Sequence, residues 1–387
     1  MVSIVGWAHS KFGKLEGQSV ESLMSEMTKV ALAHAEIGPG EVDGCFVGVY
    51  NNGFTQQDFC AGLFSVADRA LRHTPATRVE NACATGSAAI YAARDYIQSG
   101  RGRIALVVGV EKMTDTPIAK VSDILLSASF HREEASVEGG FAGVFGQIAG
   151  AYFQRYGDQS EGLAMIAAKN HKNAVSNPYA HMRKDLGFDF CNTISEKNPY
   201  AAAPLRRTDC SLISDGAAAV ILADTETALT MKRAVAFRAG VQVNDFLPLS
   251  KRDLTRFEGA SLAWKSALAT AKLDLMDLSL VETHDCFTIA EMLEYEAMGL
   301  AKQGEGAQVI SDGISQKDGA LPVNPSGGLK ARGHPLGATG VSMHVMAAMQ
   351  LMNEAQDMQI PNAELAGVFN MGGAAVANYV SILERIK

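Results

Sequence analysis

The chain has 387 residues, of which 47% are hydrophobic and 20% are charged, and this ordinary composition excludes a disordered protein. Its 34 basic and 42 acidic residues give a net charge of −8, and the basic residues form no stripe interleaved with aromatics, so nucleic acid is not expected as a partner. No apolar run approaches the roughly 18 residues of a membrane-spanning helix, and no basic leader precedes the first apolar run. We therefore expect a cytoplasmic protein with no membrane partner.

The first part of the chain alternates short apolar runs with segments of helical periodicity. The predicted strands are residues 2–5, 44–50, 78–82 and 104–110, and the predicted helices are residues 19–35 and 84–100. This alternation is typical of βαβ units and predicts a mostly parallel sheet covered by helices. The alternation of strands and helices stops over residues 115–209, which are rich in Asn, Tyr, Pro and charged residues. One helix is expected within this segment, at residues 147–156. We predict an irregular insertion there.

A second alternating block follows the insertion. Its predicted strands are residues 214–222, 234–243 and 280–283 with a last pair within 367–383, and its predicted helices are residues 259–271, 288–298 and 338–352. The tetrapeptides 83–86 (Cys-Ala-Thr-Gly) and 337–340 (Gly-Ala-Thr-Gly) echo each other, and each begins an almost wholly apolar helix. Such helices lie between layers, so a duplicated α/β fold with two central helices is predicted.

This division gives three units along the chain. They are an N-terminal half of residues 1–114 and 210–230, an insertion of residues 115–209, and a C-terminal half of residues 231–387. Four methionines in the last predicted helix recur at helical spacing and are expected to lie in the core rather than in a site: Met343, Met346, Met349 and Met352.

Among the six cysteines, Cys83 is the best candidate for a nucleophile. No two cysteines have the CxxC spacing of zinc or redox sites, so free thiols are expected. Cys83 falls at a predicted strand-to-helix junction, where unpaired backbone N–H groups and the helix dipole stabilise a thiolate. A small thiol buried for packing is the alternative that its position alone leaves open.

Two histidines and a second cysteine occupy turns that suit catalysis. His334 lies in the Gly-rich segment 326–337, which lacks the Gly-Lys-Ser/Thr ending of a phosphate loop. His284 and Cys286 follow the predicted strand 280–283, and ligands bind at the carboxyl ends of parallel strands. A metal site needs more ligands than this stretch supplies, so none is expected. Burial for packing explains each of these residues equally well when it is taken alone.

The last candidate is Gly372, the first of two glycines whose backbone N–H groups are free of side-chain obstruction. Such a pair suits an oxyanion hole as well as a tight turn. Taken together and in this order, four segments resemble the active-site motifs of the thiolase superfamily: those around Cys83, His284, His334 and Gly372. The resemblance spans essentially the whole chain.

One tetrapeptide narrows the resemblance. The sequence His-Asp-Cys-Phe at residues 284–287 is similar to the sterol carrier protein (SCP2-type) thiolase and acetyl-CoA acetyltransferase branch. Most thiolases have Asn-Glu-Ala-Phe there and a second reactive cysteine in a final Cys-x-Gly motif, where this chain has Asn370. In the branch that it resembles, the cysteine of the tetrapeptide takes over that role, so the loss at Asn370 agrees with the gain of Cys286.

The resemblance implies a fold and a reaction. The fold is a thiolase-like duplicated α/β fold, with two mixed five-stranded sheets in a five-layer α-β-α-β-α arrangement. The reaction is that of an acetyl-CoA C-acyltransferase, which cleaves 3-ketoacyl-CoA with CoA, or runs the reverse Claisen condensation, through an acyl-cysteine. Coenzyme A is then a substrate, and neither a covalently bound cofactor nor a metal is implied.

The resemblance also implies a role for each site residue. Cys83 is the nucleophile and His334 its base, and His334 forms with His284 a donor pair for the enolate oxygen. Cys286 is the acid that protonates the enolate carbon. The backbone N–H groups of Cys83 and Gly372 serve the tetrahedral intermediate.

Partners follow from the same resemblance. Coenzyme A is expected along the insertion, whose candidates for binding its phosphates are Lys184, Lys197, Arg206 and Arg207. A homodimer or a dimer of dimers is implied, with the sheets continuing across the interface. Two alternatives remain open: a thiolase-fold aldolase acting on CoA thioesters of sterol side chains, and a non-catalytic acyl-CoA-binding or scaffold subunit with a small OB-fold partner.

Overall fold

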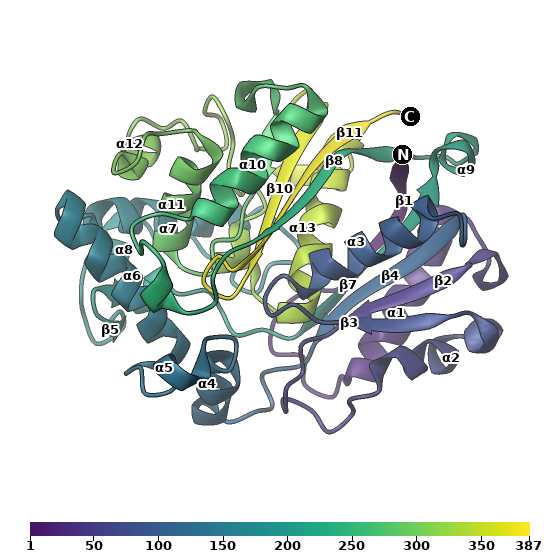
Figure 1. Ribbon diagram of the computed structural model, residues 1–387, viewed down its shortest axis with the longest axis horizontal. Coiled ribbons are helices and arrows are strands. Elements are labelled where there is room, and N and C mark those ends of the chain that lie inside the picture. The colour runs from purple at the N-terminus through teal and green to yellow at the C-terminus, as the bar shows by residue number, and fades with distance from the viewer.

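The computed structural model describes residues 1–387 and shows two halves that share one continuous sheet (Figure 1). The first half contributes five strands, in the order β3-β2-β4-β7-β1 across the sheet. Their bounds are β1 Val2–His9, β2 Gly44–Gly48, β3 Ala76–Val79, β4 Ile104–Glu111 and β7 Gly216–Asp224. β2 pairs in parallel with β3 and β4, whereas β7 pairs antiparallel with both β4 and β1.

The second half continues the sheet in the order β8-β11-β10-β9. Its strands are β8 Val235–Asn244, β9 Leu280–Glu282, β10 Leu365–Gly372 and β11 Ala377–Arg385. β10 and β11 form an antiparallel hairpin, which a short connection requires, and β9 pairs in parallel with β10. The mixed pairing implied by the resemblance is therefore confirmed, and the mostly parallel sheet predicted from periodicity is wrong.

The resemblance implied two separate sheets of five strands each, and the structure differs from this expectation in two respects. β1 pairs with β8 at Ser3 and Ile4, so that the halves are continuous, and the second half has four strands. Where a fifth strand would lie, Val323 makes a single parallel bridge to Val281 of β9. The residue before it is Pro322, which has no N–H group to donate to a ladder, so pairing stops at this bridge.

Helices cover the sheet on both sides of each half (Figure 1). The main ones are α1 Val20–Ala35, α3 Thr85–Gln98, α10 Glu258–Ala271, α11 Thr288–Met298 and α13 Leu336–Leu351. Alternate residues of β7 show the two faces of the first half, since Ile221 packs in the cluster of α1 and Val220 in the cluster of α3 and α13. In the second half, α13 contacts β10, and α10 contacts β8 and β11. α13 thus contacts strands of both halves and packs against α3 between them.

The two central helices meet at the echoing tetrapeptides. A Cβ atom on Gly86 would lie 2.7 Å from the backbone nitrogen of Val341, and one on Gly340 would lie 2.2 Å from that of Ser87. Only glycine permits this approach of the two backbones. All 16 residues of α13 are buried, so the predicted central helix is confirmed.

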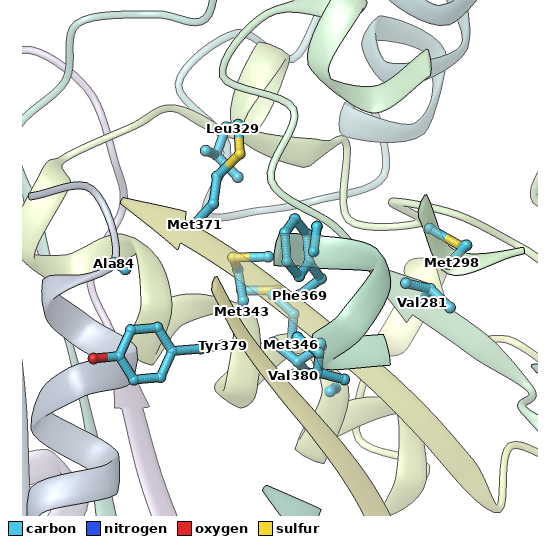
Figure 2. Close-up of a cluster of buried hydrophobic side chains, with 14 of the residues drawn as sticks. Ala84, Val281, Met298, Leu329, Met343, Met346, Phe369, Met371, Tyr379 and Val380 are labelled. Atoms are coloured by element: carbon cyan, nitrogen blue, oxygen red, sulfur yellow. The ribbon is translucent and has the colours of Figure 1, made fainter. Parts of the chain in front are cut away.

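The methionines of α13 serve the core, as predicted. Met343 and Met346 belong to the buried cluster that Figure 2 shows around Phe369 of β10. Met349 is also buried, and Met352, just beyond the last helical turn, is half-buried against the same cluster.

The insertion is mostly helical. The one helix predicted there, at residues 147–156, is confirmed within a longer helix, whereas the prediction that the rest is irregular is wrong. It contains α4 Ile118–Leu126, α5 His131–Glu134, α6 Gly140–Tyr156, α7 Ser160–Ala174, α8 Phe188–Asn192 and the hairpin of β5 Tyr200–Ala202 with β6 Leu205–Arg206. α7 was not predicted because the buried face of its second half is polar: Lys169, Asn170 and Asn173 donate hydrogen bonds to Glu291 and Asn324. A face of this kind shows no apolar stripe in the sequence.

The remaining α-helices are short, namely α2 Phe64–Ala67, α9 Thr225–Thr230 and α12 Gly306–Ser311. The strands and helices predicted for the two halves are all present, with ends shifted by a few residues. None of the helices has the length and apolar character that crossing a membrane requires.

Candidate active site

The turn between β3 and α3 presents Cys83. Ala82 has a φ of 49°, a left-handed conformation that is uncommon for a residue with a Cβ atom and turns the chain sharply before the helix. Thr85 holds this turn, since its hydroxyl donates to the carbonyl of Ala82 at 2.6 Å and accepts the N–H of Asn81 at 2.8 Å. Cys83 thus lies at a strand-to-helix junction, as the sequence predicted.

Burial dominates the chemistry of the Cys83 thiol. The residue is 4% exposed, and burial raises the pKa of its thiol to about 12, although the backbone N–H groups of Gly373 and of Cys83 itself act in the opposite direction. The predicted stabilisation of a thiolate at the helix N-terminus is therefore outweighed in the resting site. Cys83 is a neutral thiol that needs a base.

The segment between β9 and α11 carries His284, Asp285 and Cys286, all of them buried. The Asp285 carboxylate accepts the N–H of Leu329 at 2.6 Å, which ties this segment to the Gly-rich segment before the second histidine. Gly328 makes the contact possible, because its φ is 57° and a Cβ atom there would lie 2.3 Å from an Asp285 oxygen. The two histidine-bearing segments are held together in this way.

His334 lies at the end of that Gly-rich segment. Its Nδ1 is 2.7 Å from the hydroxyl oxygen of Thr339, and the Thr339 hydroxyl also contacts the carbonyl of Pro335 at 2.9 Å. Its Nε2 has no hydrogen-bond partner in the protein. Burial lowers the pKa of His334 to about 3, and the Arg332 guanidinium acts in the same direction, so the imidazole is neutral.

Three of the predicted side chains lie close together in the structure. The sulfur of Cys83 and one ring nitrogen each of His284 and His334 lie within 4.8 Å of one another. The centroids of the two imidazole rings are 5.1 Å apart, and the ring planes are nearly perpendicular, at 84°. Cys286 lines the same cavity as Cys83 and His334. Burial raises the pKa of Cys286 well above its usual value and lowers that of His284 well below its own, so all four groups are neutral at rest.

Asn370 of β10 touches two of these residues. It is fully buried, its Nδ2 donates to the carbonyl of Cys83 at 3.2 Å, and the same Nδ2 lies 2.8 Å from Nδ1 of His284. The sequence pointed to Asn370 only as the position of a missing cysteine. Its contacts depend on how β10 lies beside α3 and β9, which no local pattern reveals.

The glycine whose N–H acts on the Cys83 thiol is one residue further along the chain than the expected Gly372. The backbone N–H that acts on the Cys83 thiol belongs to Gly373, whose φ is 62°. Gly372 is paired with Ala377 in the β10–β11 ladder. The role of Gly372 as an oxyanion donor stays a prediction.

A cavity of about 620 Å³ opens from this cluster, and most of its lining is apolar. The insertion supplies one wall, and its apolar residues there are Ile118, Val121, Leu125, Phe141, Ala142 and Ala201. Arg207 is the only Lys or Arg in the lining. A larger polar cleft of about 1000 Å³ lies beside β9, and none of the predicted site residues lines it.

The other basic candidates for binding phosphates stand apart from this cavity. Arg206 is 2% exposed and pairs with Asp209 at 2.8 Å, so it serves the internal structure of the insertion. Lys184 and Lys197 are exposed but do not line the cavity.

Sequence reasoning missed three residues that hold the site in shape, namely Thr85, Thr339 and Glu111. The threonines occupy the same position in the two echoing tetrapeptides, so the echo itself carried a usable signal. Glu111, at the end of β4, accepts three backbone N–H groups and anchors the first turn of α13; they belong to Tyr50, Asn51 and Gly337. A glutamate at the end of an apolar run gives no comparable signal.

Comparisons with known proteins cover the whole chain. Residues 2–188 match the family described as thiolase, N-terminal domain, and residues 240–385 match the thiolase C-terminal domain-like family. An acetyl-CoA acetyltransferase of Methanothermobacter thermautotrophicus is 37% identical over 390 residues, which cover 99% of each chain. Sterol carrier protein 2 of Homo sapiens is 32% identical over 400 residues, covering 97% of this chain and 70% of that protein. A solved Ltp2–ChsH2(DUF35) aldolase superposes with a TM-score of 0.82 at 19% identity, over 99% of this chain and 97% of that one.

Proposed function

The chain belongs to the thiolase family, and on this premise we propose that it cleaves 3-ketoacyl-CoA with CoA, or runs the reverse condensation, through an acyl group on Cys83. Thiolases are acyltransferases that use CoA as a substrate and a cysteine as the nucleophile, without a separate cofactor. The observation that carries the proposal is the meeting of Cys83, His284 and His334 within 4.8 Å beside an apolar cavity. The direct test is consumption of 3-ketoacyl-CoA on addition of CoA. A protein that binds 3-ketoacyl-CoAs of every length but consumes none would contradict it.

His334 is the proposed base for Cys83. The Thr339 hydroxyl donates to the carbonyl of Pro335, so its oxygen is left to accept the Nδ1–H of His334. The lone pair of His334 is then on Nε2, which has no other partner. The thiol proton of Cys83 passes to Nε2 as the sulfur bonds to the ketone carbon. With pKa values of about 12 and about 3, the charged pair is not populated at rest, so the transfer accompanies the attack.

The bond between the second and third carbons of the substrate breaks next. This leaves an acyl thioester on Cys83 and the enolate of acetyl-CoA. His284 and the protonated His334 donate to the enolate oxygen, and a pair of preplaced donors is worth most in a buried site. Cys286 gives its thiol proton to the enolate carbon, and the proton held by His334 then restores that thiol.

Release of the acyl group completes the cycle. The thiol of CoA attacks the acyl carbon, its proton returns to the sulfur of Cys83, and a shortened acyl-CoA leaves. For the oxygen of each tetrahedral intermediate we propose the N–H of Cys83 together with the glycine pair, Gly372 as expected from the sequence and Gly373 from its action on the thiol. Run backwards, the same steps perform a Claisen condensation, so metabolite levels set the direction.

We propose residues 115–209 as the acyl-CoA-binding unit, because this insertion forms the apolar wall of the cavity. Replacing Ala142 of α6 by Trp is expected to fill that wall. It should lower kcat/KM for a long-chain 3-ketoacyl-CoA by about 100-fold and leave acetoacetyl-CoA within about threefold. Steady-state kinetics with both substrates check this, with Gln147→Trp on the exposed side of α6 as the control. Equal losses for the short and long substrates would contradict the assignment of this wall to the acyl chain.

Arg207 is the proposed contact for a phosphate of CoA, because it is the only cation in the cavity lining and has no ion pair within the chain. Arg207→Ala is expected to raise the KM for acyl-CoA about tenfold with kcat nearly unchanged, and the increase should shrink at high salt. The matched control is Lys197→Ala, which removes an exposed charge that does not line the cavity. A KM unaffected by Arg207→Ala would place the phosphates elsewhere.

Assembly as a homodimer is also proposed. β3 is an edge strand that pairs only with β2, and its first two residues, Ala76 and Thr77, are exposed. A free edge of this kind offers unpaired backbone groups to a second copy, which would continue the sheet across the interface. Light scattering would report the mass of two chains. A small partner protein, which the resemblance implies to be of the OB-fold kind, is a further proposal. The name of the solved aldolase includes a second component, DUF35, and this supports a partner protein without defining its fold.

An aldolase acting on CoA thioesters of sterol side chains is the second candidate. It is favoured by the TM-score of 0.82 to the solved aldolase, a likeness that at 19% identity concerns the fold. The retention of both Cys83 and Cys286 beside two histidines favours the thiolase reaction instead. Retro-aldol cleavage forms no acyl-cysteine and consumes no CoA, so cleavage that proceeds equally without CoA would decide for the aldolase.

A further inference from the structure

Asn370 holds one of the two site histidines in a defined tautomer. The carbonyl of Cys83 can only accept a hydrogen bond, so the amide of Asn370 must direct its Nδ2 toward it, at 3.2 Å. The second hydrogen of the same Nδ2 points to Nδ1 of His284, 2.8 Å away. Nδ1 is therefore the acceptor, and the proton of the neutral His284 imidazole is on Nε2.

The two histidines consequently differ at Nε2, the ring nitrogen that neither Asn370 nor Thr339 contacts. Nε2 of His284 carries a hydrogen, whereas Nε2 of His334 carries a lone pair, because Thr339 accepts the Nδ1–H of that ring. Neither Nε2 has a partner within the protein, and both are buried. The cluster therefore holds one donor and one acceptor, although its two side chains are chemically identical.

We propose that Asn370 is a positioning residue that fixes His284 as a hydrogen-bond donor and thereby keeps thiophilic divalent metal ions out of the cluster of Cys83, His284 and His334. The first part rests on the proposed function, since the donor serves the enolate oxygen. The second part stands on the geometry alone.

The cluster contains the types of ligand atom that bind a metal ion. Three ligand atoms, one sulfur and two imidazole nitrogens, lie within 4.8 Å of one another, and three protein ligands of these kinds suffice for zinc. A metal would displace the thiol proton of Cys83 to solvent and would require a lone pair on each coordinating nitrogen. Histidine ligands normally donate their other N–H to a carboxylate or a carbonyl.

Asn370 opposes this arrangement at His284. Moving the ring proton to Nδ1 would set two N–H groups against each other across 2.8 Å. Rotating the amide would not relieve the conflict, because Oδ1 would then face the carbonyl oxygen of Cys83. Asn370 is fully buried, so no water competes for either contact. The metal-binding tautomer is therefore penalised in either orientation of the amide.

The test is Asn370→Asp, which keeps the shape of the side chain and replaces the donor by an acceptor. The carboxylate would accept Nδ1–H of His284 and free the lone pair on Nε2. Titration with Co²⁺ is expected to give the intense thiolate-to-cobalt absorption in the variant, with an affinity about 10- to 100-fold above that of the wild type. Adding Cys83→Ala to the variant should abolish the band. The kcat for thiolysis should fall about 100-fold with little change in KM, because a donor to the transition state is lost.

Asn370→Ala supplies a second variant should the buried carboxylate prevent folding, which thermal unfolding would reveal. It removes the Nδ2 donor without adding an acceptor, so it too is expected to bind Co²⁺ more tightly than the wild type. Equal Co²⁺ affinity in the wild type and in the folded variants would overturn the inference. If the wild type lacks thiolase activity but the variants bind Co²⁺ more tightly than it does, the proposed function is contradicted and the tautomer assignment is retained.

Discussion

Replacing Cys83 by alanine is expected to lower CoA-dependent cleavage of 3-ketoacyl-CoA by about 10⁵-fold or more while acyl-CoA binding stays within a few-fold. The sulfur is the only atom at this position that can hold the acyl group, and the remaining donors bind substrate without opening a path to products. Cys83 is small and lies in the turn just before α3, so the change removes little packing. Turnover assays and calorimetric titration with a substrate analogue measure the two quantities.

Cys60→Ala is the matched control for this experiment. Cys60 is also a buried thiol, but it packs with α1 on the far face of the first half of the sheet. Its loss should leave turnover within about threefold, since a buried sulfur removed there affects stability alone. Turnover that survives Cys83→Ala would contradict the nucleophile assignment. Acyl-CoA binding by a wild type that shows no turnover would support the non-catalytic scaffold alternative.

Replacing Cys286 by alanine is expected to separate the two halves of the reaction. Loss of the acid should lower cleavage of 3-ketoacyl-CoA by about 10²- to 10⁴-fold, because the enolate carbon no longer receives its proton. Transfer of an acetyl group from acetyl-CoA to Cys83 involves no carbon–carbon bond and should persist. Exchange of the methyl protons of acetyl-CoA with deuterium in the solvent should disappear together with cleavage.

The exchange experiment distinguishes an acid from a packing residue. Cys286 is 3% exposed and followed by Phe287, which stacks on Phe145, so a merely structural role would lower acetyl transfer and exchange alike. Exchange that continues at the wild-type rate in Cys286→Ala would assign the proton transfer to another group. The buried Glu294 would then be examined, because its charge is one of those that raise the pKa of Cys286.

Both halves of the fold could be predicted because their elements bury apolar faces. β4 and β7 are apolar on both sides, and α13 is apolar all round, so each leaves a clear pattern in the sequence. Apart from α6, the helices of the insertion could not be predicted, and α7 shows the opposite situation. The inner face of the second half of α7 is polar, and Lys169 and Asn170 there hydrogen-bond to the buried Glu291.

The proposed reacting groups could be predicted from the sequence, but the residues that position them and the electrostatics of the site could not. Cys83 and His334 are 251 positions apart, and it was the order of the motifs, not local periodicity, that joined them. The helix N-terminus at Cys83 is a local feature and was visible in the sequence. The burial that raises the pKa of its thiol to about 12 comes from layers that close over it, and these are formed by distant parts of the chain.

The most direct test of the account is the intact mass of the protein after mixing with 3-ketoacyl-CoAs of several lengths in the absence of free CoA. The account predicts an acyl adduct whose mass follows the substrate, mapped to Cys83 by peptide analysis, absent from Cys83→Ala, and discharged on addition of CoA. An unmodified mass with every substrate, in a protein that still binds acyl-CoA, would contradict the acyl-cysteine mechanism.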